Sequence, residues 1–241
     1  MKYEFSAQVC YGRSVESMMN LSRAMLEVGR VKGRPTIDAK WDKESWRGVE
    51  PMSLRHHMGE PPEHSPRTLV KVAYDEAAIY VIFRVEDRYV RATTQRHQGA
   101  VCKDSCVEFF FTTGTDVSTG YFNLEMNCGG TMLFHFQEKP RGGVEITEDD
   151  YGLITIATTL PRIVDPEIEQ PTTWVVEYRI PIEILDKYCK LSKPAQGVKW
   201  RGNFYKCGDD TSHPHWLTWS AVDHETPNFH LPDFLGDIEF T

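Results

Sequence analysis

Residues 101–112, VCKDSCVEFFFT, hold two cysteines, two acidic residues and three consecutive phenylalanines. Three residues separate Cys102 from Cys106, whereas zinc knuckles and thioredoxin-like sites use C-x2-C, and no second pair follows. In an extended strand the two residues would lie about 13 Å apart, too far to share a metal ion. Six cysteines are sparse for 241 residues, so we expect mostly reduced, buried thiols and no metal or redox site here.

Glu108 and Glu125 are the candidate catalytic residues. Glycoside hydrolases hold two carboxyl groups about 5–5.5 Å apart for retention of configuration or about 6.5–9.5 Å for inversion. Acids on a polar strand face are more often solvated or hydrogen-bonded, and the chain has no G-x-S-x-G, H-E-x-x-H or glycine-rich phosphate loop. Binding is therefore the preferred interpretation, and catalysis the alternative.

Two further groups of residues are candidates for ligand binding: possible metal ligands and possible sugar-stacking aromatic residues. The segment CGDDTSHPHW, residues 207–216, contains metal-ligand types at Asp209, Asp210, His213 and His215, although such a loop is more often an exposed turn. Aromatic faces can stack on sugar C–H surfaces while amides and carboxylates bind the hydroxyls. Four tryptophans lie near polar loops: Trp41, Trp46, Trp216 and Trp219. We expect at least half of these tryptophans to pack in the core.

The elements that position these residues are mostly strands. Alternation with a period of two predicts strands at residues 77–87, 120–128, 131–137, 152–160, 173–181 and 198–207. One short helix is predicted from Pro181 to Lys187, with a proline at its first turn. Polar turns separate the strands, so we predict an all-β fold, a two-sheet antiparallel β-sandwich of immunoglobulin-like or jelly-roll type.

The same alternation assigns the faces of the strand at residues 106–112. Val107, Phe109 and Phe111 point to the core. The other face carries Glu108 beside the polar residues Asn123 and Glu125 of the next strand. Such a face is either solvated or built to hold a polar ligand.

The first thirty residues differ from the rest. Apolar residues recur at helical spacing between Val15 and Leu26, with Ser14 as the N-cap and Gly29 as the stop. We therefore predict a docked helical extension over residues 1–30, followed by the sandwich at residues 31–241. No secretory signal is apparent at the start, which, with the reduced thiols, favours the cytoplasm.

Charge and hydropathy restrict the partners. The formal net charge is −8, no Lys/Arg run exceeds two residues, and no apolar stretch approaches the roughly 20 residues of a membrane helix. Nucleic acid and membranes are therefore not expected partners.

Several segments together resemble the family 9 carbohydrate-binding modules, and more closely the family-9-like bacterial proteins. The family's opening I-D-G…D…W corresponds to Ile37-Asp38-Ala39…Asp42…Trp46, and its L-Y-V…V-x-D strand to residues 79–87. Its W-x-D-S-V-E-x-F segment corresponds to CKDSCVEFF at residues 102–110. YFNLEMNCGGTM and NFHLPDFLGDIEF resemble its later strands, and the likeness covers residues 31–241 in the expected order.

The resemblance implies a non-catalytic, glycoside-hydrolase-associated module that binds the reducing end of plant-wall chains such as xylan or cellulose. By position, its two sugar-stacking tryptophans fall on Cys102 and Phe229. Its polar contacts fall on Asp87, Glu108 and Asn123. Family members also carry structural calcium, but no loop here specifies it, and we expect no other cofactor.

A cysteine at position 102 would remove a stacking face worth about 1 kcal/mol beyond its buried area. Tyr121 and Trp216 are candidates to replace that ring. We expect carbohydrate binding through Asp87, Glu108, Asn123 and Phe229 around position 102. The alternatives are a glycoside hydrolase or lyase, a haem-binding relative using Met126 and His135, and a scaffold whose sugar site has been lost.

Overall fold

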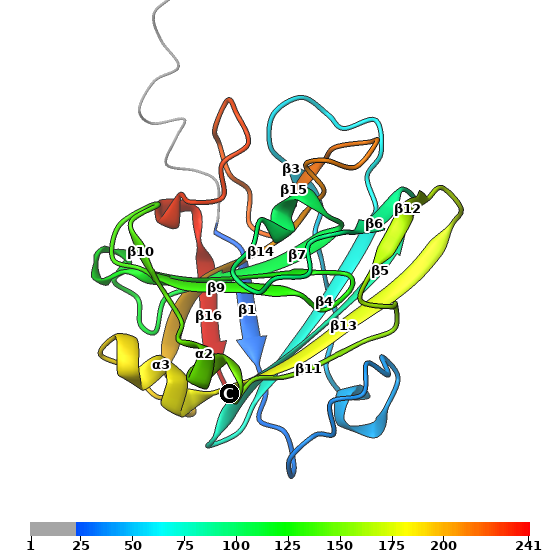
Figure 1. The fold of residues 1–241 in the computed structure, drawn as a ribbon. Helices are drawn as coiled ribbons and strands as arrows, with labels where there is room; N and C mark the ends of the chain where they lie inside the picture. Colours follow the sequence, from blue (N-terminus) through cyan, green and yellow to red (C-terminus); the bar gives the residue numbers. More distant parts are fainter. Residues whose placement is uncertain (1–22) are drawn as a thin grey trace, which may run out of the picture.

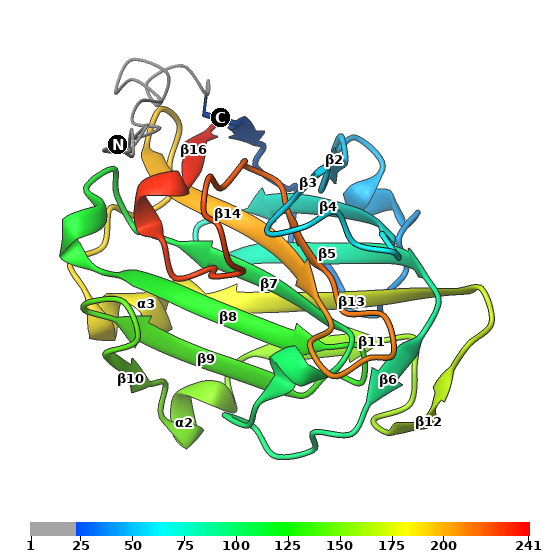
Figure 2. The ribbon, with the colours of Figure 1, turned by 90° about the horizontal axis from the view of Figure 1, so that it is seen from above.

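The computed structural model describes residues 23–241. They form two large β-sheets that pack face to face around one core, with a small two-stranded sheet at one end (Figures 1 and 2). All neighbouring strands are antiparallel except one pair at an edge, so the predicted β-sandwich is confirmed.

The larger sheet has nine strands and carries the candidate site. Its main order is β1 (Met25–Val28), β16 (Gly236–Phe240), β14 (Lys199–Cys207), β7 (Cys106–Phe111), β8 (Tyr121–Asn127), β9 (Met132–Gln137) and β10 (Gly143–Glu145). The far end of β14 also pairs with β15 (Trp216–Thr218), which in turn pairs with β3 (His56–His57).

The smaller sheet has five strands and lies behind the larger one in Figure 2. Its order is β11 (Thr155–Thr158), β13 (Thr172–Pro181), β5 (Ala78–Asp87), β4 (Arg67–Tyr74) and β2 (Met52–Ser53). β6 (Val90–Ala92) and β12 (Val164–Ile168) make the two-stranded sheet. The helices are α2 (Glu148–Tyr151), α3 (Ile182–Tyr188) and the 3-10 turns η1 (Glu44–Trp46), η2 (Val101–Lys103), η3 (Val117–Thr119) and η4 (Pro232–Phe234).

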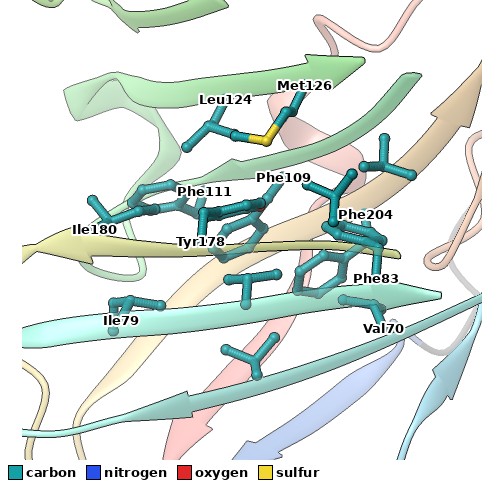
Figure 3. Close-up of a cluster of buried hydrophobic side chains, with 14 of the residues drawn as sticks. Val70, Ile79, Phe83, Phe109, Phe111, Leu124, Met126, Tyr178, Ile180 and Phe204 are labelled. Atoms are coloured by element: carbon teal, nitrogen blue, oxygen red, sulfur yellow. The ribbon is translucent and has the colours of Figure 1, made fainter. Parts of the chain in front are cut away.

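The core lies between the sheets and is rich in aromatic rings (Figure 3). Phe109 stacks on Phe204 of the neighbouring strand with ring centroids 4.5 Å apart, and Phe111 stacks on Trp200. Val107 is buried in the same cluster, which confirms the predicted inward face of β7. Burying each large apolar side chain contributes about 1.5–3 kcal/mol. This packing fixes β7 so that its alternate residues must face away from the core.

The predicted strands are found as β5, β8, β9, β11, β13 and β14, and the predicted helix as α3, although β11 spans only Thr155–Thr158 of the expected 152–160. The N-terminal helix is wrong at its end, because Met25 and Leu26 belong to β1. Leu26 and Val28 face the core while Met25 and Glu27 are exposed, which is a period of two. The rest of the expected helix lies outside the described residues. No helix within residues 23–241 is long and apolar enough to cross a membrane.

Residues 31–49 cover the outer face of the smaller sheet with a second apolar cluster that includes the buried ring of Trp46. Glu177 of β13 holds this segment: its carboxylate accepts hydrogen bonds from the backbone N–H groups of Asp38 and Ala39, at 3.0 and 2.8 Å, and from Trp46 Nε1 at 2.9 Å. Ala39 has a φ of 56°, in the left-handed region. The I-D-A…D…W segment therefore has a structural role here.

Candidate functional site

A pocket of about 300 Å³ lies on the outer face of the larger sheet, over β7, β8 and β14. In Figure 2 the loops that follow β14 and β15, coloured orange to red, cross this face. The pocket is lined by Cys102, Glu108, Phe110, Glu125, Arg141, Cys207, Asp209, Trp216, Pro227, Asn228, Phe229 and His230. The face that the alternation predicted to be polar is thus the floor of a pocket.

Two carboxyl groups form the floor. Glu108 on β7 and Glu125 on β8 are directly opposite each other in the strand ladder, and only 2% and 7% of their surfaces are exposed. Glu125 Oε1 accepts a hydrogen bond from Asn123 Nδ2 at 3.0 Å, and Gln137 Nε2 donates to Asn123 Oδ1 at 2.9 Å. Asn123 therefore orients the carboxyl group of Glu125 in the floor.

Burial dominates the electrostatics of the floor. It raises the pKa of Glu125 to about 7, and burial together with the charge of Glu125 raises the pKa of Glu108 well above its usual range. Burial also raises the pKa of Asp209 at the pocket wall. Glu108 Oε1 accepts from the Cys207 thiol at 3.1 Å, while Oε2 has no hydrogen-bond partner among residues 23–241. The floor therefore offers unused acceptor capacity to a ligand.

Aromatic rings form the walls. Phe229 stacks on Tyr205 of β14, with ring centroids 4.1 Å apart and planes inclined by 15°. Trp216 at the start of β15 donates from Nε1 to Asp209 Oδ1 at 2.8 Å. Both Trp216 and Cys102 pack against the same small apolar cluster beside β7. Trp216 thus supplies an aromatic ring next to the cysteine, from a different strand.

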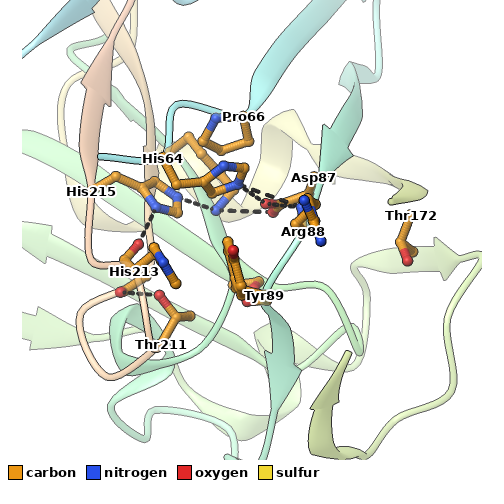
Figure 4. Close-up of polar contacts among 12 residues, drawn as sticks. His64, Pro66, Asp87, Arg88, Tyr89, Thr172, Thr211, His213 and His215 are labelled. Carbon is orange, nitrogen blue, oxygen red and sulfur yellow. Dashed lines mark hydrogen bonds and ion pairs between the residues drawn. The ribbon is translucent and has the colours of Figure 1, made fainter. Parts of the chain in front are cut away.

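The predicted site residues separate into three groups. Cys102, Glu108 and Phe229 line the pocket. Asn123 is buried beside it and acts on Glu125. Asp87 lies elsewhere, at the end of β5, beside His64 (Figure 4). Lys206 and Trp174 also contact its carboxylate.

That second polar cluster sits inside the sandwich. Lys206 is fully buried, lies 3.5 Å from Asp87 Oδ2, and contacts His215 Nε2 at 2.7 Å. Although burial opposes ionisation of Asp87, Lys206 and the His64 contact lower its pKa to about 2. Burial, and then the charge of Lys206, lower the pKa of His215 to about 3. Asp87 therefore pairs with protein groups and does not face the pocket.

The metal-ligand types of the loop at residues 207–216 do not converge. Asp209 lines the pocket, Asp210 pairs with Lys103 at 3.1 Å, and His213 stacks on Tyr89 with centroids 3.6 Å apart. His215 accepts from Lys206 instead. These four residues share no site.

The residues of the haem hypothesis also diverge. Met126 is buried in the core between the sheets. His135 pairs with Asn123 across β8 and β9, so it points to the opposite face from Met126. The two side chains cannot bind one iron.

The pocket lining also contains residues that the sequence did not indicate as binding residues: Phe110, Arg141, Cys207, Asp209, Pro227, Asn228 and His230. Asp209 had been considered only as a metal ligand. Its position depends on tertiary contacts, because its N–H and that of Asp210 bond to the carbonyls of Cys102 and Lys103. The only available signal was a loop of Asp and Trp after a strand that ends beside the polar face.

A β-sandwich with an acidic, aromatic-walled pocket on one sheet is the architecture of a ligand-binding module. The model of carbohydrate-binding family 9 matches residues 56–240. The chain therefore belongs to carbohydrate-binding family 9. No match was found among the curated proteins.

Solved structures share the fold. A protein from Bacteroides uniformis ATCC 8492, provisionally described as carbohydrate-binding, is 26% identical and has a TM-score of 0.82, covering 91% of this chain and 100% of its own. A family 9 module from Caldicellulosiruptor kristjanssonii in complex with cellotriose is 19% identical, with a TM-score of 0.63, over 90% of this chain and 93% of its own. The structure of such a module from the same organism with glucose is 17% identical, with a TM-score of 0.61, over 90% and 96%.

Proposed function

We propose that the pocket binds one end of a carbohydrate chain without cleaving it. The observation that carries this proposal is a buried acidic floor with an unpartnered oxygen on Glu108, in a pocket that the rings of Trp216 and Phe229 also line. Apolar ring faces suit the C–H surface of a sugar, and carboxylates suit its hydroxyl groups. A volume of about 300 Å³ is at the low end for ligand pockets, which favours a single terminal ring.

Each side chain has a proposed role. Trp216 and Phe229 contact the faces of the ring, and Glu108, Glu125 and Asp209 bind hydroxyls. Arg141 at the rim adds hydrogen-bond donors. Asn123 acts by orienting Glu125, and Cys102 borders the pocket without a stacking surface. The relatives with cellotriose and glucose support a β-glucan chain as the ligand, and a xylan-like chain is the alternative that the sequence resemblance suggests.

Isothermal titration calorimetry tests the proposal. The panel is glucose, xylose, cellotriose, xylotriose and several unrelated oligosaccharides. We expect binding of at least one β-linked oligosaccharide, and a five- to tenfold loss of affinity in Trp216→Ala, from about 1 kcal/mol of lost stacking. Trp41→Ala is the matched control, because Trp41 packs under Lys71 on the other sheet. Folded protein that binds nothing in the panel, or equal losses in both variants, would refute the proposal.

Hydrolysis is the second candidate, because Glu125, with a pKa of about 7, could donate a proton near neutral pH. Binding is better supported, since a hydrolase needs its second carboxyl group ionised and burial raises the pKa of both groups here. Activity on a panel of chromogenic glycosides that disappears in Glu108→Gln would reverse this preference.

A further inference from the structure

Two cysteines from distant parts of the chain meet under the pocket. Cys106 on β7 and Cys207 on β14 are paired residues of neighbouring antiparallel strands, on the same face as Glu108. The Cys207 thiol lies 3.1 Å from Glu108 Oε1. One ligand atom from each of Cys106, Glu108 and Cys207 lies within 4.8 Å of the other two, and all three residues are at most 2% exposed.

The protein leaves much of the binding capacity of these groups unused. Glu108 Oε2 is buried and has no partner among the described residues. Cys106 makes two weak contacts: its thiol approaches the carbonyl oxygen of Val107, at 3.7 Å, and the thiol of Cys207. The nearest buried cation, Lys206, lies on the other face of β14 and is engaged by Asp87 and His215. Among the described residues, no lysine or arginine side chain forms an ion pair with this buried carboxyl group or contacts the two thiols.

We propose that Cys106, Cys207 and Glu108 form a binding site for a borderline-soft divalent cation, best matched by Zn²⁺. Two sulfur ligands and one carboxylate oxygen are donors that Zn²⁺ accepts in a tetrahedral set, whereas Ca²⁺ and Mg²⁺ require oxygen ligands. Three protein ligands leave a fourth position, which the pocket supplies to water or to a ligand oxygen. Loading releases the protons of both thiols and of the Glu108 carboxyl group, because the thiolate and the carboxylate are the ligand forms.

The pocket also provides the route to the site. Glu108 and Cys207 line its floor, so an ion that approaches through the pocket meets them first. Cys106 is the cross-strand partner of Cys207 and completes the set from β7. The site shares Glu108 with the proposed sugar pocket, but its loading is measured without sugar, so the two proposals are tested separately.

The test uses the full chain, purified under reducing conditions, loaded with Zn²⁺ and dialysed. We expect one zinc per chain by elemental analysis, and a thiolate-to-cobalt charge-transfer absorption when Co²⁺ replaces it. In Cys106→Ser/Cys207→Ser, competition with a chromogenic chelator should show affinity lower by more than about a hundredfold. Glu108→Gln, which keeps both thiols, should weaken binding by a smaller factor.

Cys189→Ser is the matched control, because Cys189 lies after α3, away from the pocket, with its sulfur 3.1 Å from Thr113 Oγ1. This variant should retain zinc and the cobalt absorption. Circular dichroism verifies that every variant is folded. The proposal is overturned if reduced, folded protein retains no zinc, if the double cysteine variant binds it as tightly as the parent chain, or if mass spectrometry finds Cys106 and Cys207 joined as a disulfide in the freshly purified protein.

Discussion

In the proposed function, Trp216 takes the role of the tryptophan that the family resemblance would place at position 102. The family motif would place a tryptophan at Cys102, on the turn before β7. Here the cysteine and Trp216 pack against the same small cluster, and the indole comes from β15 instead. An aromatic wall therefore remains, but its ring is held by a hydrogen bond to Asp209, a residue of the preceding loop.

Ala39 carries a conformational cost that a single substitution should relieve. Its φ of 56° lies in the left-handed region, where an L-residue with a Cβ costs about 1–2 kcal/mol and glycine does not. Because glycine has more freedom to lose in the unfolded chain, Ala39→Gly should raise the free energy of unfolding by about 0.5–1 kcal/mol net. Urea denaturation measures this. Ala77→Gly, at an exposed position with no positive φ, should give no gain, and equal effects would contradict the assignment.

His215 should make the protein sensitive to acid. Its Nε2 accepts from Lys206 and its Nδ1 donates to the carbonyl of His213, so the folded state requires the neutral ring. The pKa of His215 is 6.5 when the group is unperturbed and about 3 in the folded protein. As pH falls from 6.5 towards 3, His215 becomes protonated in the unfolded chain but stays neutral in the folded protein. The contribution of His215 to the free energy of unfolding is therefore fully present above pH 6.5 and declines below it.

In His215→Gln this decline should be shallower, by up to about 1.4 kcal/mol per pH unit. Unfolding free energies from urea titrations at several pH values between about 4 and about 7 give the slope. His57→Gln is the control, since His57 is exposed on β3. An unchanged slope in His215→Gln would show that the ring is not held neutral. Asp87 acts in the same direction but at lower pH, because its folded pKa is about 2.

At the scale of elements, the alternation of apolar and polar residues predicted the strands that carry the site, because one face of each strand is buried in the core. In β7 and β8 the inward residues are uniformly apolar, so their outward residues, Glu108 and Glu125 among them, could be assigned without knowing the fold. The apolar positions of β1 are too few to separate a period of two from a helical one. The strand exists because β16 offers it a free edge, which the local sequence does not reveal.

β1 should contribute strongly to stability. Leu26 and Val28 are buried in the main core, and β1 covers the backbone edge of β16. Compared with a chain that begins at residue 23, one that begins at residue 30 should lose about 3–6 kcal/mol of unfolding free energy. It should also aggregate more readily through the exposed edge.

Urea denaturation and light scattering measure both effects. Val28→Ala, which keeps the strand, should cost less than the deletion and provides the measurement if the shorter chain does not fold. A shorter chain as stable as its reference would show that β1 adds nothing to the sheet.

At the scale of the whole molecule, the two sheets have different outer faces. The smaller sheet is covered by residues 31–49, which Glu177 anchors, and the larger sheet carries the pocket. Fold class and the acidic floor followed from the sequence, since both depend on repeated local patterns. Most of the pocket walls did not. Arg141 and Asp209 come from loops and Trp216 from the short strand β15, whose positions are set by contacts with distant strands, and Phe229 was indicated only by the family resemblance.

The parallel pairing of β1 with β16 determines where the protein can be attached to a support. Val28 is opposite Phe240, and the N–H of Thr241 bonds to the Val28 carbonyl at 2.9 Å, so the last residue is fixed beside the first described strand. Glu239 pairs with Lys199 at one end of β14, whereas the pocket lies at Cys207, the other end of the same strand. Eight residues of extended strand span about 26 Å. A sensor surface or affinity resin coupled through residue 241 would therefore hold the protein with its pocket turned away from the matrix and open to dissolved glycans.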